Sequence, residues 1–409
     1  MRILTLVPNL VPDEIAGGRR VALDLNHGYR KEGYDCKILT FGRSTEKMKN
    51  RYNVEGIEIQ KIPTPSDHAQ YNYLSVRTLP THFFYSQASK LSSIFSKYDL
   101  IHIHNLHSIR LLKDVIKAKE ESGKPIVWTV HDYWFCCPRN TIIDNHQQIC
   151  DDYECFQKCY RDKKFIWKYS INRKKDTKLL QKLDLIIPPS KFMKDRLVKS
   201  GFDKNKIKLI YNGIPDIPYN KKIKRDSKDI LYIGTPWPHK GVGVLLEALN
   251  SLKDLGHKFT LHILGNIGPT PEIRNRINTL KLKRNVKIHG FVSQEEKSGW
   301  LSKAGILVLP SIWPENCSIV LLEGLRAGIP IITTKMGGNP ELVIHGQNGI
   351  ICPPNNKEEL INAILKIKTN KEYANELGKK GRKRFVERFT SKEMVNKYLK
   401  SISGRFIIE

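Results

Sequence analysis

The sequence predicts an α/β protein with two doubly wound, parallel-sheet domains that face each other across a cleft. Short apolar runs alternate with helix-length amphipathic segments, and this rhythm starts again after residue 229. The 409 residues are enough for two domains. Residues 212–229, "NGIPDIPYNKKIKRDSKD", are interrupted by glycine and proline and then become charged, which is typical of a linker. We therefore expect domains at 1–215 and 216–385.

In the first half, five apolar runs predict strands, and most are continuous in isoleucine, leucine and valine, as in strands buried on both faces of a parallel sheet. The predicted strands are 2–7, 35–41, 100–104, 126–130 and 185–188. Amphipathic segments between them predict helices at 18–32, 109–122 and 191–200.

The second half repeats the pattern, and ligands of such sheets bind at the carboxyl ends of the strands. The predicted strands are 230–233, 260–264, 287–289, 306–309, 329–333 and 349–352. The predicted helices are 242–255, 270–280, 294–303, 319–327 and 357–368. With two such domains, we expect the site in the cleft between them.

The charge balance favours anionic partners. Lysine and arginine exceed aspartate and glutamate by 69 − 41 = +28, which suits phosphorylated small molecules, nucleic acid or an anionic membrane surface. Lysines spread along the chain as solvated charge are the alternative. No nucleic-acid motif accompanies the charge, so we do not expect nucleic acid as a partner, and a basic nucleic-acid-binding protein is only a remote alternative.

The apolar runs also bear on where the protein works. None approaches the roughly 18 residues of a membrane-spanning helix. The first apolar run is short and is broken by Pro8 and Pro12, so it predicts a buried strand and not a signal peptide. We therefore expect a cytoplasmic protein.

Two strand–loop–helix junctions are candidates for binding phosphate. Gly17 and Gly18 follow the first predicted strand and open a helix, whose free amides would suit an anion, although turn glycines are common there for structural reasons. Lys240 stands where a helix begins after "GTPWPHK". A cation at that end of a helix is unfavourable unless an anion shares the site, so Lys240 is the stronger phosphate candidate.

Two glutamates, Glu315 and Glu323, lie eight positions apart in "PENCSIVLLEGLRAGIP". Glu315 falls in the loop after a buried strand. Glu323 lies one turn into a helix that Gly328 would close. Glu323 is surrounded by leucine, isoleucine and valine, where an unpaired charge is costly. Carboxylates can accept two charge-assisted hydrogen bonds from adjacent sugar hydroxyls. The amides of the intervening residues would face a phosphate: Cys317, Ser318 and Ile319.

These motifs together resemble the retaining GT-B glycosyltransferases of family 4 (glycosyl transferases group 1), which have two Rossmann-like domains. The resemblance rests on "PENCSIVLLEGLRAGIPIITT", "GTPWPHKGVGVLLEAL" and "GGNPELVIHGQNG" in the second half. In the first half it rests on the early Gly17-Gly18 loop, "WTVHD", "PPSKFMKDRL" and "IYNGI". It spans nearly the whole chain, and it implies a hexosyltransferase-type enzyme.

The resemblance also implies roles for individual residues. Glu315, with the adjacent Asn316, would contact the donor sugar, and Glu323 would bind the ribose of the nucleotide. Lys240 would hold the diphosphate, together with amides at Gly17-Gly18 and at residues 317–319. His131 matches the family histidine that approaches the reacting sugar, although a histidine at a strand end can be purely structural.

Further expectations concern the base and one departure from the family. Phe291 and Val292 would contact the base through the backbone. Many relatives have an arginine at the position of Thr235, so diphosphate binding would depend more on Lys240 and on amides. Arg19 or Arg20 is a candidate replacement.

The family's C-terminal helix usually crosses back to the first domain. Residues 386–409 are expected to do so here, with Phe385, Phe389, Met394 and Tyr398 on the apolar side. Packing alone would explain these four side chains equally well.

The resemblance implies transfer of a sugar from a nucleotide-diphosphate-sugar to a glycan or lipid-linked acceptor, in cell-surface polysaccharide biosynthesis. The leaving diphosphate would accept the acceptor's proton, so no cofactor is expected for catalysis. The enzyme could work as a peripheral protein at the anionic inner face of the cell membrane. A GT-B nucleotide-sugar epimerase or hydrolase is the alternative.

A cysteine cluster at about 136–160 forms an insertion in the first domain. Cys137, Cys150, Cys155 and Cys159 could hold a structural zinc ion through four thiolates. Free thiols and disulfides are the alternatives, and a cytosolic location argues against disulfides.

Overall fold

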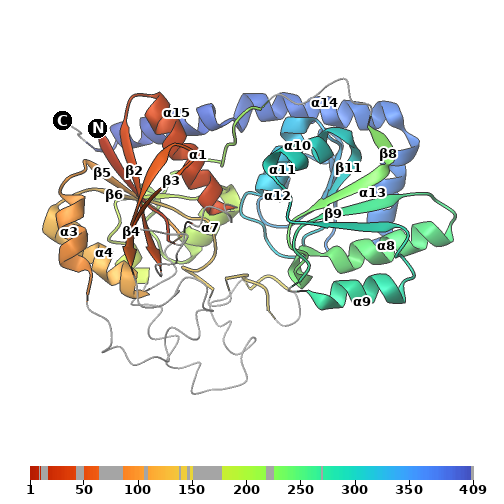
Figure 1. The fold of residues 1–409 in the computed structure, drawn as a ribbon, viewed down its shortest axis with the longest axis horizontal. Coiled ribbons are helices and arrows are strands. Elements are labelled where there is room, and N and C mark those ends of the chain that lie inside the picture. Colours follow the sequence, from red (N-terminus) through yellow and green to blue (C-terminus); the bar gives the residue numbers. More distant parts are fainter. Residues whose placement is uncertain are drawn as a thin grey trace, which may run out of the picture. The chain divides into compact units, whose positions relative to one another are not determined.

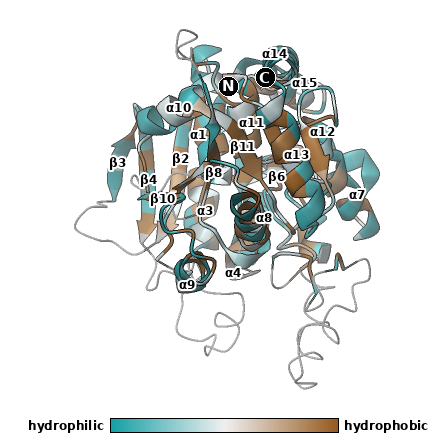
Figure 2. Cartoon of the chain, turned by 90° about the vertical axis from the view of Figure 1, so that its right-hand side faces the viewer, coloured by the Kyte–Doolittle hydropathy of each residue, from teal (hydrophilic) through white to brown (hydrophobic). Residues whose placement is uncertain are grey.

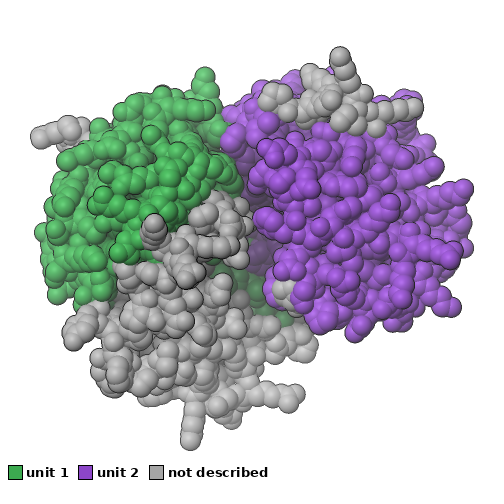
Figure 3. All heavy atoms as spheres, in the orientation of Figure 1, with its two compact units in different colours: residues 1–212, 391–409 green, residues 213–390 purple. Residues whose placement is uncertain are grey.

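The computed structural model describes residues 1–8, 10, 17–42, 50–63, 86–105, 109–137, 140–144, 148–150, 177–217, 225–268 and 270–406. The chain divides into two compact units (Figure 3), and each has its own sheet (Figure 1). The first contains Met1–Asn212 and Ser391–Glu409, and the second contains Gly213–Thr390.

The first unit has a seven-stranded sheet in the order β3-β4-β2-β1-β5-β6-β7. Among the strands described in this unit, the β3–β4 pair is antiparallel and the other pairs are parallel. The strands are β1 Arg2–Leu6, β2 Asp35–Gly42, β3 Arg51–Val54, β4 Ile57–Pro63, β5 Leu100–His104, β6 Ile126–Thr129 and β7 Leu185–Ile187. The helices are α1 Gly18–Lys31, α3 Ala88–Phe95, α4 Ile109–Ser122, α7 Lys191–Lys199 and α15 Ser391–Ser403, with a 3₁₀ turn at Lys204–Lys206.

The second unit has a six-stranded parallel sheet in the order β10-β9-β8-β11-β12-β13. Its strands are β8 Asp226–Ile233, β9 Thr260–Leu264, β10 Val286–Gly290, β11 Ala304–Leu309, β12 Ile331–Thr334 and β13 Ile350–Cys352. Its helices are α8 Val242–Asp254, α9 Pro271–Thr279, α10 Gln294–Lys303, α11 Ile319–Ala327, α12 Asn339–Leu342, α13 Lys357–Thr369 and α14 Lys371–Arg388, with a 3₁₀ turn at Pro238–Lys240.

The predicted doubly wound fold is confirmed. The parallel strands of each unit follow the order 3-2-1-4-5-6 of such sheets. This order reverses direction between β1 and β5 in the first unit and between β8 and β11 in the second. Loops that leave neighbouring strands at a reversal diverge, and ligands of open α/β sheets bind there.

The interior strands are buried and mainly apolar, as the sequence pattern predicts, although β5 also carries His102 and His104. Every residue of β5 and β11 is buried, and Figure 2 shows β11 in the brown of hydrophobic residues and α7 mainly in the teal of hydrophilic ones. Gly328 ends α11 in the left-handed conformation (φ 62°), as expected. Within the described part of the chain, no helix combines the length and the apolar character that crossing a membrane requires.

Strands β3 and β4 form a hairpin that the sequence analysis did not predict. β3 is largely exposed, so its sequence, Arg-Tyr-Asn-Val, lacks the apolar run by which the other strands were recognised. Glu55 and Gly56 make the turn with positive φ angles of 50° and 82°. Helix α14 was not predicted either, because its sequence is dominated by charged residues that show little apolar periodicity.

The C-terminal segment differs from the single helix expected from residue 386. Helix α14 ends at Arg388 and α15 begins at Ser391. Phe385 and Phe389 are buried in the second unit, and Met394 and Tyr398 in the first. The backbone at Thr390 bridges that at Ile214. The chain therefore leaves the second unit beside the point where it enters.

Helices α1 and α15 approach each other closely at Gly28. A Cβ atom on Gly28 would lie 2.1 Å from Cγ2 of Val395. In an open helix, Gly28→Ala would gain about 1 kcal/mol from helix propensity. Here we expect it to lower the free energy of unfolding by about 1–3 kcal/mol, because the two helices are forced apart. Urea unfolding measures this change.

Val395→Ala provides the matched test, because it removes the methyl groups that the new Cβ would meet. The double variant should be more stable than Gly28→Ala alone. A Gly28→Ala variant more stable than the wild type would contradict the close approach.

Candidate functional site

Lys240 and Glu315 form an ion pair at the reversal point of the second sheet. Lys240 ends the 3₁₀ turn after β8, and Glu315 lies in the loop after β11. The Lys240 Nζ donates to Glu315 Oε1 at 2.7 Å, and so does the Ser311 hydroxyl, also at 2.7 Å. The Lys240 ammonium also lies 4.7 Å from the ring centroid of Trp313. The sequence placed both residues at the site but did not predict that they pair.

The two loops are held by close backbone packing. Gly241, the N-cap of α8, has the left-handed conformation (φ 74°). It lies so near Pro310 that a Cβ would be 1.9 Å from the Pro310 carbonyl oxygen. Gly337, also left-handed (φ 57°), lies against Glu315 in the same way, with a Cβ position 2.2 Å from the Glu315 carbonyl oxygen. The Gly338 amide donates to that oxygen at 2.6 Å. The "GGNPE" motif thus fixes the backbone that carries Glu315.

Lys240 determines the charge states of the two titratable groups beside it, Glu315 and His239. Glu315 is 6% exposed, and burial alone would raise the pKa of its carboxyl group. Lys240, aided by Ser311 and Trp313, outweighs burial and holds the pKa below its ordinary value. Burial and the nearby Lys240 charge lower the pKa of His239 to about 4. Glu315 is therefore a carboxylate at neutral pH, and His239 is uncharged.

Glu323 is buried, as its apolar neighbours led us to expect, and is paired with a lysine that the sequence analysis missed. The Lys297 Nζ of α10 lies 2.5 Å from Oε1 of Glu323 on α11. The other carboxylate oxygen, Oε2, is buried without a hydrogen-bond partner. Ionised carboxylates accept several hydrogen bonds, so Glu323 retains acceptor capacity.

The remaining predicted residues of the second unit lie at the carboxyl ends of its strands. Thr235 follows β8 and is half-buried, and Phe291, with Val292 after it, follows β10 and is 75% exposed. Asn316 and Cys317 are buried between Glu315 and the start of α11. Ser318 caps this helix by accepting from the Leu321 amide, and Ile319 is its first residue. The first turn of α11 therefore follows Glu315 directly.

In the first unit, Gly17-Gly18 and His131 come together at the reversal point between β1 and β5. Gly17 is the N-cap of α1 in the left-handed region (φ 56°). A Cβ on Gly18 would lie 2.6 Å from Cγ of His131 and 2.8 Å from Oδ1 of Asn105. His131 Nε2 lies 2.7 Å from Nδ1 of His104, the last residue of β5. Neither His104 nor Asn105 was predicted, although "HIH" at a strand end places two histidines on one face.

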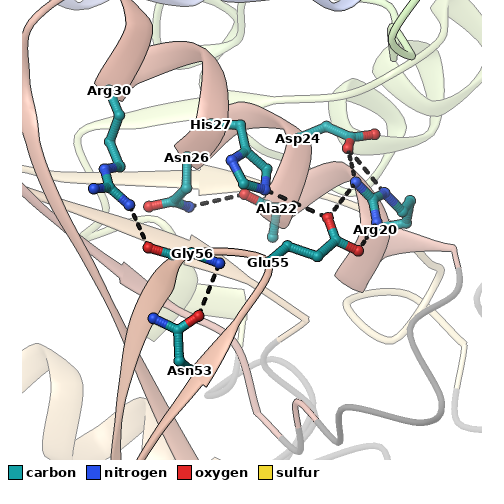
Figure 4. A network of polar contacts seen from close by, with 9 residues as sticks. All are labelled: Arg20, Ala22, Asp24, Asn26, His27, Arg30, Asn53, Glu55 and Gly56. Atoms are coloured by element: carbon teal, nitrogen blue, oxygen red, sulfur yellow. Dashed lines mark hydrogen bonds and ion pairs between the residues drawn. The ribbon is translucent and has the colours of Figure 1, made fainter. Parts of the chain in front are cut away.

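Arg20 is held by acidic side chains of the first unit. Its guanidinium bonds Asp24 Oδ1 at 2.5 and 2.8 Å and both Glu55 oxygens at 2.7 and 3.0 Å (Figure 4). His27 also contacts Glu55, at 3.4 Å. The network ties α1 to the β3–β4 turn. It argues against Arg20 as the replacement for the arginine absent at Thr235.

The predicted zinc cluster is only partly within the described residues. Cys137 Sγ accepts from the Ile142 amide at 3.2 Å, and the Cys150 amide donates to the Ile142 carbonyl at 2.9 Å. Cys155 and Cys159 lie outside the described residues, so zinc binding stays a prediction. Among the residues described, no three His, Cys, Asp or Glu side chains are grouped to hold a metal ion.

Sequence comparison gives the same division into two halves. Residues 15–216 match the family "Glycosyltransferase Family 4", and residues 214–384 match "Glycosyl transferases group 1". An uncharacterized glycosyltransferase of Methanocaldococcus jannaschii is 33% identical over 218 residues, which cover 52% of this chain and 57% of the relative. The amylovoran biosynthesis glycosyltransferase AmsK of Erwinia amylovora is 29% identical over 203 residues, 47% of this chain and 50% of the relative. The alignments thus span about half the length of these relatives.

Structural comparison extends over the whole chain. The crystal structure of HepE of Anabaena, in complex with UDP and glucose, has a TM-score of 0.72 and 19% identity. The match covers 99% of this chain and 100% of HepE. With both family matches and two doubly wound sheets, the chain belongs to the family 4/group 1 glycosyltransferases of the GT-B fold.

Proposed function

We propose that this chain transfers a sugar from a nucleoside diphosphate sugar to a glycan or lipid-linked acceptor, with retention of the anomeric configuration. The Lys240–Glu315 pair, with its buried carboxylate and half-buried ammonium, carries this proposal. A cation lies beside a carboxylate at the reversal point of a doubly wound sheet, and a carboxylate can accept hydrogen bonds from sugar hydroxyls. A nucleoside diphosphate sugar carries a diphosphate, which would match Lys240, and a hydroxylated sugar, which would match Glu315. One bond joins these two groups.

The roles follow from the chemistry of each group. The Lys240 ammonium and the first amides of α11 hold the diphosphate. The Glu315 carboxylate accepts hydrogen bonds from sugar hydroxyls. Glu323 accepts from the ribose through its unpartnered Oε2. The exposed Phe291 comes directly after β10 and would contact the base of the nucleotide.

In the reaction, the bond between the sugar C1 and the diphosphate oxygen breaks, and its electron pair leaves with the phosphate. The acceptor oxygen bonds to C1 on the same face, and its proton passes to the leaving phosphate. Lys240 stabilises the charge that develops on that group, which is the kind of contribution that typically dominates catalysis. His131 contacts the reacting sugar.

The acceptor belongs to cell-surface polysaccharide assembly in this proposal, which the name of the amylovoran biosynthesis relative supports. A lipid-linked acceptor would bring the protein to an anionic membrane face, where the net charge of +28 would assist binding.

A thermal-shift panel of nucleoside diphosphate sugars tests the donor class. A specific donor should raise the melting temperature in a concentration-dependent way, and the matching nucleoside monophosphate should raise it less. The stabilising donor is then incubated with candidate acceptors, and the glycosidic proton of the product is read by NMR. Inversion at C1 would contradict retention. Release of free sugar without an acceptor, or epimerised donor, would instead favour the hydrolase or epimerase alternative.

A further inference from the structure

His104, at the end of β5, contacts His131 through a short ring–ring hydrogen bond. The two nitrogens, Nδ1 of His104 and Nε2 of His131, are 2.7 Å apart. The ring centroids are 5.0 Å apart and the ring planes differ by 18°, so the two rings lie end to end and nearly in one plane, as an N–H···N hydrogen bond requires. His104 is completely buried. Two neutral imidazoles at this distance share one proton, so one ring donates and the other accepts.

The surroundings of His104 decide which ring donates. Its other nitrogen, Nε2, is buried and has no hydrogen-bond partner. If His131 donated, His104 would carry its own proton on Nε2, as a buried N–H without an acceptor. If His104 donates, its Nε2 is an unprotonated acceptor. Orphaned buried N–H groups are rarer than under-used acceptors, so donation by His104 is favoured.

This choice requires His104 to be neutral, and the packing around it ensures this. Burial and the neighbouring His102 and His131 hold the pKa of His104 well below its ordinary value. The His102 ring lies 4.3 Å from the His104 ring, centroid to centroid. His102 Nε2 lies 2.7 Å from the Thr129 hydroxyl, which lies 2.9 Å from the Tyr398 hydroxyl of α15. No acidic group takes part in these contacts.

The ring of His131 is also restrained by α1. The missing Cβ of Gly18 leaves the space in which Cγ and Cδ2 of His131 lie, at 2.6 and 2.8 Å from the Cβ position. His131 is therefore held between His104 and the first turn of α1. Its Nε2 faces His104, and its Nδ1 lies across the ring from Cδ2.

We propose that His104 is a positioning residue that keeps the proton of His131 on Nδ1. His131 then meets the substrate as a hydrogen-bond donor through Nδ1, and it does not act as a base through Nε2. The tautomer of His131 is a property of the protein without substrate, so it can be tested whether or not the proposed function is correct. The effect of the tautomer on catalysis rests on the proposed sugar transfer.

The first test is NMR of the ¹⁵N-labelled full chain at neutral pH, with long-range ¹H–¹⁵N correlations that identify the protonated nitrogen. His131→Gln assigns the signals. In the wild type we expect protonated Nδ1 and unprotonated Nε2 on His131. Protonated Nε2 on His131 in the wild type would overturn the proposal, whether or not sugar transfer is found.

The second test compares His104→Leu with His104→Asn, two side chains of nearly equal size. Asparagine retains an N–H near the position of Nδ1, and leucine does not. The leucine variant should lose about 10- to 100-fold in kcat, as misplaced catalytic groups do, with donor KM within about twofold. The asparagine variant should recover most of that loss. Equal losses in two folded variants, or wild-type kcat in the leucine variant, would overturn the proposal. If neither variant folds, the wild-type tautomer decides.

Discussion

Replacing Glu315 by glutamine should lower kcat about 100-fold or more, in the range found when one preorganised polar group of an active site is removed. The variant keeps the size of the side chain and loses only its charge. The amide cannot accept strongly from sugar hydroxyls while it also satisfies Lys240 and Ser311. Steady-state transfer with the stabilising donor measures the loss.

Glu376→Gln is the matched control, because Glu376 makes an exposed helix pair with Lys380. Exposed pairs of this kind contribute little, so activity and stability should stay at wild-type values. A folded Glu315→Gln variant that transfers sugar at the wild-type rate would show that Glu315 does not contact the donor sugar.

Replacing Lys240 by methionine should affect both catalysis and folding. Loss of the phosphate contact should lower kcat/KM about 100- to 1,000-fold. The folded state also loses the partner of Glu315, whose carboxylate is buried. Leaving one member of a buried pair unpaired costs about 3 kcal/mol. Activity and urea unfolding measure the two effects, with Lys380→Met as the exposed control. Wild-type turnover by a folded Lys240→Met variant would contradict the assignment.

The double variant Lys240→Met/Glu315→Gln separates the two effects. With both charges removed, much of the lost stability should return, but activity should not. The pH dependence has a fixed sign. The folded-state pKa of Glu315 lies below its ordinary value of 4.5. The stability from the pair is therefore present above about pH 4.5 and is lost as pH falls through the lower, folded-state pKa. The difference in stability between wild type and Lys240→Met should shrink over that range.

The parts of the site that local sequence determines were predictable. The loops after β8 and β11, the helix start at Ser318 and the cap at Gly328 each depend on neighbouring residues. The burial of Glu323 followed from its apolar neighbours in the same way.

Contacts between distant residues were harder to predict. Lys240 and Glu315 are 75 positions apart, and only the pairing of β8 with β11 brings them together. Lys297 and Glu323 meet because helices α10 and α11 pack against each other. The sequences of the two helices do not show that they are neighbours. His104 had a signal in "HIHN", since alternate strand residues share a face. Its partner is set by the order of β5 and β6.

At Thr235, where many relatives have an arginine, the family resemblance does not predict which residue takes over the role of that arginine. The sequence offered two arginines as replacements, and the structure engages Arg20 with Asp24 and Glu55. Glu55 belongs to the unpredicted β3–β4 turn, so this engagement was invisible without that hairpin. In the proposed function, diphosphate binding therefore depends on Lys240 and the amides of α11 and not on Arg20.

Calorimetric titration with two related ligands tests most directly whether Lys240 and Glu315 bind opposite ends of one donor. The ligands are the stabilising nucleoside diphosphate sugar and its nucleoside diphosphate. Lys240→Met should weaken both by about tenfold or more, which is at least about 1.4 kcal/mol. Glu315→Gln should bind the diphosphate at least as tightly as wild type, because Lys240 loses its negatively charged partner. It should lose the added affinity that the sugar provides. Equal weakening of both ligands by Glu315→Gln, or no weakening of either by Lys240→Met, would contradict the division of roles.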